Sequence, residues 1–167
     1  MQNVMMDVPH ILLAADDPDF ALLIQLGFHE SGILNPIYVV NDGHAALSYL
    51  NGEGQYSNRI SFPLPALLLI DARLQHVPGF EVIRWIRQQP ALSDTHVVLF
   101  SNLGSETDAR LAEEVGADYY LAKPFDYQDL VGIVRRIGVS WLQPESFPQM
   151  PSVPVGPSLS LCSPKQA

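Results

Sequence analysis

The stretch ALLLID, residues 66–71, decides the fold, because five consecutive apolar residues end on a single aspartate, Asp71. Three further short apolar runs end on polar residues in the same way: residues 11–15 before Asp16 and Asp17, residues 97–100 before Ser101, and residues 119–122 before Lys123 and Pro124. Short apolar runs that alternate with helical patterns predict parallel strands covered on both faces. In such sheets ligands bind at the carboxyl ends of the strands. These polar residues are therefore expected to meet at one edge of a sheet.

Helical patterns lie between these strands. Asp17 is expected to cap a helix whose first residue is Pro18, where the missing N–H of proline costs nothing. That helix is expected to end near Gly32. The remaining elements are predicted as a strand over residues 36–40 and helices after residues 78–79 and over residues 43–50, 107–115 and 127–141. The alternation predicts an α/β fold, a doubly wound five-stranded parallel sheet with helices on both faces.

Three regions are predicted along the chain: a leader over residues 1–9, a folded domain over residues 10–142, and a tail over residues 143–167. Within the domain, residues 51–65 contain two glycines, two prolines and few apolar residues, which favours a long loop. The tail is rich in proline and serine and almost free of charge. We therefore expect it to be disordered, without a helix or a strand.

The charge balance and composition narrow the class of protein. Eighteen acidic residues outnumber nine basic ones, and the net charge of −9 disfavours a nucleic-acid surface. No apolar stretch approaches the roughly 20 residues that cross a bilayer. A single cysteine, Cys162, excludes an internal disulfide and favours a reducing compartment, and the first ten residues lack the pattern of a secretory signal. We expect a cytoplasmic protein that binds neither DNA nor a membrane.

The predicted edge carries the residue types of a phosphoryl-transfer site. The carboxylate of Asp71 can attack a phosphoryl group and form an acyl phosphate. Asp16 supplies a second carboxylate for Mg²⁺, which takes about six oxygen ligands and keeps several waters. Lys123 offers a positive charge to a phosphate oxygen, and Pro124 raises the chance of a cis peptide bond that would direct this lysine over the site. Ser101 can donate a hydrogen bond to the arriving group.

Each of these residues also has a simpler interpretation. Asp71 could be a turn aspartate, Lys123 a solvated surface lysine and Ser101 an ordinary turn residue. Asp16 and Asp17 could together be a capping pair. The favoured interpretation is that Asp16 binds the metal and Asp17 caps the helix. A role for Asp17 as a further metal ligand stays open. The sequence contains neither the GxxxxGK[ST] and GxGxxG motifs of nucleotide binding nor the GxSxG motif of hydrolases.

With these residues in view, the chain resembles the receiver domain of two-component response regulators over about residues 11–142. The likeness is greatest to the stand-alone receivers that partner phytochrome-type and related sensor histidine kinases. It is carried by NPIYVVNDGHAALSYL (35–50), FPLPALLLID (62–71), GFEVIRWIR (79–87) and GADYYLAKPF (116–125). Asp71, Ser101 and Lys123 occur together at receiver spacing. The resemblance implies a flavodoxin-like sheet with the strand order 2-1-3-4-5.

The resemblance also implies a role for each site residue: Asp71 as phosphoacceptor, Ser101 as switch hydroxyl, Lys123 as phosphate contact, Tyr120 as aromatic switch, and Asp16, Asp71 and the main-chain carbonyl of Arg73 as Mg²⁺ ligands. In the family, the aromatic side chain turns inward when the hydroxyl moves towards the phosphate. The resemblance further implies a signalling protein rather than an enzyme, with at most slow self-dephosphorylation. A sensor histidine kinase would be its partner, and protein contacts would carry its output.

The sequence departs from the family pattern near the predicted site. The family has two adjacent acids after the first strand, and Ala15 replaces the first of them, which should weaken Mg²⁺ binding unless Asp17 compensates. Gln75 stands where proline is common, and Pro78 stands where an acid is common. Asn102 replaces a small residue beside the switch hydroxyl. Ala15 and the altered 75–78 loop motivate an alternative, a pseudo-receiver that binds partners independently of phosphorylation.

Two more interpretations concern other chemistry and assembly. A phosphatase with a nucleophilic aspartate is disfavoured, because it needs a second aspartate two residues after the first, where Arg73 stands. A homodimer is also expected, since Tyr119, Leu130, Val134 and Trp141 could form an apolar face. The competing interpretation places most of these four residues in the core.

Overall fold

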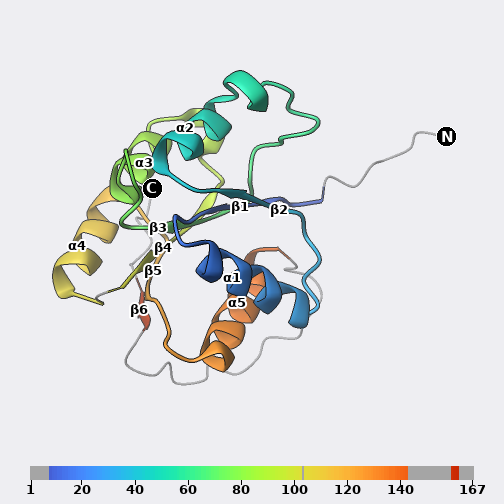
Figure 1. Cartoon of the computed structure of the whole chain (residues 1–167). Coiled ribbons are helices and arrows are strands. Elements are labelled where there is room, and N and C mark those ends of the chain that lie inside the picture. Colours follow the sequence, from blue (N-terminus) through green and yellow to red (C-terminus); the bar gives the residue numbers. More distant parts are fainter. Residues whose placement is uncertain (1–7, 103, 143–158, 162–167) are drawn as a thin grey trace.

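A twisted sheet lies between two layers of helices in the computed structural model, which describes residues 8–102, 104–142 and 159–161 (Figure 1). The elements follow one another in the order β1 (Ile11–Ala14), α1 (Pro18–Glu30), β2 (Ile37–Val40), α2 (Gly43–Asn51), η1 (Gly54–Tyr56), β3 (Leu67–Asp71), α3 (Gly79–Ile86), η2 (Pro90–Leu92), β4 (His96–Ser101), α4 (Glu106–Val115), β5 (Tyr119–Ala122), α5 (Tyr127–Trp141) and β6 (Leu159–Leu161). The predicted alternation of strands and helices is therefore confirmed.

The strand order across the sheet is β2-β1-β3-β4-β5-β6, and β1 to β5 run parallel. The predicted doubly wound arrangement with the order 2-1-3-4-5 is confirmed for these strands. The register pairs Ala14 with Ile70 and Asp71 with Phe100. Because these pairs align the strands, the residues that follow β1, β3 and β4 meet at one edge of the sheet.

The tail prediction needs a correction at residues 159–161. These residues form β6, which pairs antiparallel with β5, with Ser160 as the Cα partner of Tyr120. Strand pairing uses only backbone N–H and C=O groups, and the short LSL run contains no proline to interrupt them. The rest of the predicted tail (residues 143–158 and 162–167) and most of the predicted leader (residues 1–7) lie outside the described residues.

Alternate residues of each strand face two separate layers of the core. Leu68 and Ile70 point towards α2, α3 and α4, whereas Leu67 and Leu69 point towards α1 and α5. All four are completely buried, as expected for a parallel strand that is covered on both faces. The helices complete this packing because each turns an apolar face inward: Val82, Ile83 and Ile86 of α3 are fully buried.

The predicted apolar homodimer face is wrong for two of its four residues. Leu130 and Val134 of α5 are buried in the layer between the sheet and α1, so the competing core interpretation holds for them. Trp141 is half-buried and packs between two other rings. Its ring centroid lies 4.8 Å from that of His96 and 4.9 Å from that of Tyr119. Because α5 uses Leu130 and Val134 to cover the sheet, these two side chains are not available to a second chain.

The segment between α2 and β3 is more ordered than the predicted long loop. It contains the short helix η1, and Tyr56 and Phe62 pack their rings against Tyr49 at centroid distances of 5.1 and 6.0 Å. Arg59 fixes the segment by donating 2.7 Å hydrogen bonds to the carbonyl oxygens of Tyr49 and Leu50 at the end of α2. The aromatic side chains therefore extend the core beyond the sheet.

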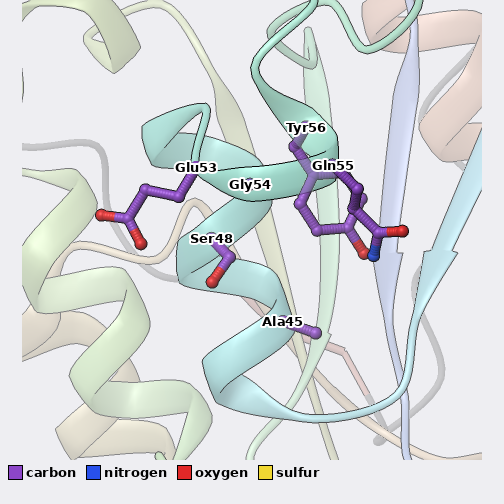
Figure 2. A pocket seen from close by; sticks show the side chains of 6 residues that line it. All are labelled: Ala45, Ser48, Glu53, Gly54, Gln55 and Tyr56. Atoms are coloured by element: carbon purple, nitrogen blue, oxygen red, sulfur yellow. The ribbon is translucent and has the colours of Figure 1, made fainter.

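A shallow surface hollow lies between α2 and η1 (Figure 2). It is lined by residues of both elements and by the N-cap of η1: Ala45, Ser48, Glu53, Gly54, Gln55 and Tyr56. None of these residues belongs to the predicted phosphoryl-transfer site. Throughout the described part of the chain, no helix has both the length and the apolar character needed to cross a membrane.

Candidate phosphoryl-acceptor site

Asp71 is the last residue of β3 and is only 3% exposed. The backbone on its carboxyl side is held by the neighbouring strand, because the N–H of Ala72 donates to the carbonyl of Phe100 at 2.8 Å. The start of α3 lies directly against this turn, where the N–H of Gly79 donates to the carbonyl of Ala72 at 3.1 Å. A Cβ atom at position 79 would lie 2.2 Å from the carbonyl oxygen of Asp71, so this close approach requires glycine.

The carboxylate of Asp71 has partners on both of its oxygens. Its Oδ2 atom accepts a hydrogen bond and ion pair from the ammonium group of Lys123, and its Oδ1 atom accepts a 3.0 Å hydrogen bond from the backbone N–H of Arg73. The Lys123 ammonium also lies 4.4 Å from the ring centroid of Phe20, in the first turn of α1. The buried charge of the aspartate is therefore compensated, as burial of a carboxylate requires.

Lys123 reaches Asp71 because β5 ends beside β4. Its backbone N–H donates to the carbonyl of Ser101 at 2.9 Å, which fixes the start of the turn into α5. The suggested cis peptide bond before Pro124 is absent, since no described peptide bond is cis. A trans bond suffices here, because the long lysine side chain reaches past the end of β4 to Asp71 at the end of β3. The predicted meeting of Asp71 and Lys123 is found.

Ser101 and Tyr120 lie on the other side of the sheet, towards α3 and α4. Ser101 is completely buried, and its hydroxyl donates a 2.8 Å hydrogen bond to Oδ2 of Asp108 in the first turn of α4. Tyr120 is 3% exposed and packs in the core layer between the sheet and these helices. Its hydroxyl has no hydrogen-bond partner among the described residues. The aromatic residue at the predicted switch position therefore points inward.

Of the two aspartates after β1, Asp17 caps α1 as predicted. Oδ1 of Asp17 accepts hydrogen bonds from the backbone N–H groups of Asp19 at 2.9 Å and Phe20 at 3.4 Å, and Pro18 opens α1. The capping prediction is confirmed. Asp16 is exposed and leaves its carboxylate accessible at the sheet edge.

The oxygen donors at this edge fit a hard divalent cation. The ligands that the resemblance implies, the carboxylates of Asp16 and Asp71 and the main-chain carbonyl of Arg73, lie at or just after the ends of β1 and β3, and such oxygens are the ligands that Mg²⁺ takes together with water. The described residues contain no cluster of three or more acids, histidines or cysteines placed to hold a metal. Ala15, which follows the residue paired with Ile70, is buried and offers only a methyl group where an acid was expected. The site therefore has a reduced but chemically suitable donor set.

The unusual residues between β3 and α3 form an anchored turn. The carbonyl of Gln75 accepts hydrogen bonds from Gly43 at 3.1 Å and Val77 at 2.8 Å, so the turn is tied to the start of α2. His76 adopts a positive φ of 66°, and Pro78 precedes the first residue of α3. The altered sequence therefore still produces a defined loop beside Asp71, in which the side chain of Arg73 is exposed to solvent.

Asp108 and Phe20 belong to the site but were not predicted from the sequence. Asp108 lies three residues after the N-cap Ser105, a spacing typical of a local capping box. In the structure its backbone N–H donates to the Ser105 hydroxyl at 3.1 Å, while its carboxylate turns to Ser101. Phe20 falls on the apolar face of α1. Its spacing along the helix is that of an ordinary core residue, so the sequence gives no sign that its ring contacts the Lys123 ammonium group.

Comparisons with known proteins agree with this geometry. Residues 11–135 match the response regulator receiver domain, and the chain belongs to this family. The response regulator Rcp1 of Synechocystis sp. is 32% identical over 138 residues, which are 83% of this chain and 92% of Rcp1. The structure of the phosphorylated cyanobacterial phytochrome response regulator RcpA matches with a TM-score of 0.75 and 30% identity, covering 84% of this chain and 99% of RcpA.

A second solved structure, the Mn²⁺-bound form of Rcp1, matches with a TM-score of 0.72 and 30% identity over 84% of this chain and all of that chain. The chain thus resembles stand-alone response regulators associated with phytochromes, as predicted. Members of the receiver family are signalling proteins of two-component systems rather than classical enzymes. The predicted class of protein is therefore confirmed.

Proposed function

We propose that this protein is a single-domain response regulator that accepts a phosphoryl group from a sensor histidine kinase onto Asp71, with Mg²⁺ bound. The observation that carries the proposal is the buried Asp71 carboxylate, held by Lys123 and by a backbone N–H at the carboxyl edge of a parallel sheet. Nucleophile and cation are thus in place before the phosphoryl group arrives. Such positioning is a large part of what phosphoryl transfer requires of a protein.

In the proposed reaction, a carboxylate oxygen of Asp71 attacks the phosphorus of a phosphohistidine. A P–O bond forms and the P–N bond breaks, and the donor ring keeps the electron pair and leaves as neutral imidazole, because its other nitrogen carries a proton. Lys123 remains next to the product and pairs with a phosphoryl oxygen. Mg²⁺, held by Asp16, Asp71 and the carbonyl of Arg73, would offset the negative charge of the transferring group.

The signal would leave through protein contacts. Phosphorylation replaces the single negative charge of the Asp71 carboxylate with up to about two on the acyl phosphate, and Ser101 would reorient towards the new acceptor oxygens. The receiver resemblance to RcpA, described as a phytochrome response regulator, supports a phytochrome-type or related kinase as the donor. A cytoplasmic location, slow self-dephosphorylation and absence of DNA binding complete the proposal. Homodimerisation stays a prediction, although Leu130 and Val134 of the expected apolar face are buried in the core.

The test is labelling with a small phosphodonor such as acetyl phosphate, with Mg²⁺ or with EDTA. Intact-mass spectrometry should show one added phosphoryl group on the wild-type protein with Mg²⁺ only, and none on Asp71→Asn. Asp94→Asn is the matched control, because Asp94 is an exposed aspartate next to the start of β4, at the opposite edge of the sheet. Labelling that persists in Asp71→Asn would place the acceptor elsewhere and overturn the proposal.

A pseudo-receiver is the second candidate, and the buried methyl group of Ala15 favours it. With one carboxylate fewer, the edge holds a divalent ion less strongly, and Lys123 alone would then neutralise Asp71. This candidate predicts no labelling under any condition, no effect of Mg²⁺ on thermal stability, and partner binding unchanged by Asp71→Asn. The labelling assay with the Asp94→Asn control therefore separates the two candidates.

A further inference from the structure

The hydrogen bond between Ser101 and Asp108 joins the predicted site to α4. Ser101 is the last residue of β4 and is completely buried, while Asp108 is half-buried in the first turn of α4. The distance from the serine Oγ to Oδ2 of Asp108 is 2.8 Å, typical of a bond from a hydroxyl to a carboxylate. Asp108 itself is held in place, because its backbone N–H donates to the hydroxyl of the N-cap Ser105.

The carboxylate of Asp108 and a phosphoryl group on Asp71 would compete for the single hydroxyl hydrogen of Ser101. A serine hydroxyl has a single hydrogen to donate, and in this structure it is directed to Asp108. A phosphoryl oxygen on Asp71 would require the same hydrogen, and hence a rotation or shift of Ser101. The carboxylate of Asp108 is a strong acceptor, so the exchange replaces one charge-assisted hydrogen bond with another.

We propose that Asp108 is a positioning residue that holds the Ser101 hydroxyl away from Asp71 in the unphosphorylated protein. The inference rests on the proposed function. The strength of this hydrogen bond sets the fraction of molecules in which Ser101 can bind the phosphoryl group, and so lowers the apparent affinity of the site for a phosphoryl mimic. Because Asp108 is in α4, release of Ser101 also removes a contact between this helix and the sheet. A change at Asp71 is thereby transmitted to the surface of α4.

The test is titration of the full-length protein with beryllium trifluoride, a phosphoryl mimic, in the presence of Mg²⁺, followed by calorimetry. Asp108→Asn keeps the size of the side chain but weakens the acceptor, and we expect roughly five- to tenfold tighter binding of the mimic. Glu106→Gln is the matched control, since Glu106 is an exposed acid in the same helical turn. Circular dichroism and thermal melting establish that both variants fold.

A double-mutant cycle separates positioning from simple charge removal. If Asp108 acts through Ser101, Asp108→Asn should have no additional effect in the Ser101→Ala background. An equal gain in both backgrounds, or the same gain in Glu106→Gln, would overturn the inference and leave the proposed function intact. Failure of the wild-type protein to bind the mimic at all, together with failure of acetyl phosphate labelling, would instead overturn both.

Discussion

Gly79→Ala should disturb both the stability of the fold and the position of the phosphoacceptor. Gly79 is the first residue of α3, and a Cβ atom there would lie 2.2 Å from the carbonyl oxygen of Asp71, 3.0 Å from its carbonyl carbon and 3.2 Å from the Cα atom of Ala72. Ordinary van der Waals contact begins near 3.4 Å, so the backbone must move by more than 1 Å. All three neighbouring atoms are backbone atoms, and no side-chain rotation can relieve the overlap.

The expected magnitude follows from two opposing terms. Overpacking of a rigid site costs about 1–3 kcal/mol, occasionally more. Alanine is a better helix former than glycine and returns about 1 kcal/mol at most. We therefore expect a net loss of about 1–2 kcal/mol in the free energy of unfolding, or a fall of several degrees in Tm. Labelling of Asp71 should fall as well, because the carboxylate moves with its backbone.

Urea denaturation and thermal melting measure the stability change, and intact-mass spectrometry after acetyl phosphate treatment measures the labelling. Gly132→Ala is the matched control, since Gly132 is exposed in α5 and a Cβ atom there would meet nothing within 4 Å. This control should be stabilised by about 0.5–1 kcal/mol. If Gly79→Ala were as stable as the wild-type protein, with unchanged labelling, the inferred close contact between α3 and Asp71 would be wrong.

Two further predictions concern parts of the fold away from the site. Arg87→Met removes three hydrogen bonds, which the guanidinium donates to the carbonyls of Gly116 and Thr95 and to the carboxylate of Asp118 at 2.8, 3.1 and 3.0 Å. Because the Arg87 side chain is only a quarter exposed, we expect urea denaturation to show a loss of about 2–3 kcal/mol in the free energy of unfolding. The control Arg84→Met, at an exposed arginine, should lose less than about 0.5 kcal/mol. Equal losses in the two variants would contradict the assigned network. Burial raises the pKa of Tyr49 in the folded protein. Above pH ~10 the Tyr49 hydroxyl therefore loses its proton in the unfolded chain but keeps it in the folded one, so the free energy of unfolding falls as the pH rises. Tyr49→Phe should reduce that alkaline slope in urea titrations, and an unchanged slope would refute the assignment.

Much of the fold and part of the site could be predicted from local sequence. The apolar runs ending on Asp71, Ser101 and Lys123 identified the strands, because buried parallel strands require continuous apolar residues. The contact between Asp71 and Lys123 followed from the shared strand edge. Both predictions depended on one regular property, the alignment of parallel strands at their carboxyl ends.

Other contacts could not be predicted from the sequence, because they join separate segments of the chain and have no distinctive local pattern. The SETD segment at residues 105–108 has the pattern of a local helix cap, yet the carboxylate of Asp108 binds Ser101 instead. Tyr56 and Phe62 have no regular spacing, and only the folded chain shows them packed on Tyr49. The three residues of β6 form a strand because β5 has a free edge, a property of the sheet and not of the LSL run itself.

The opposite orientations of neighbouring strand residues also place the two proposed tasks, capture of the phosphoryl group and output of the signal, on opposite faces of the sheet. In the proposed function, Asp71 and Lys123 capture the phosphoryl group beside α1 and α5, while Ser101 and Tyr120 face α3 and α4. Substitutions in the α1–α5 layer should therefore retune which donor is served and how fast, and substitutions in the opposite layer should retune which downstream protein responds. The two faces of one sheet would thus separate the choice of donor from the choice of downstream partner.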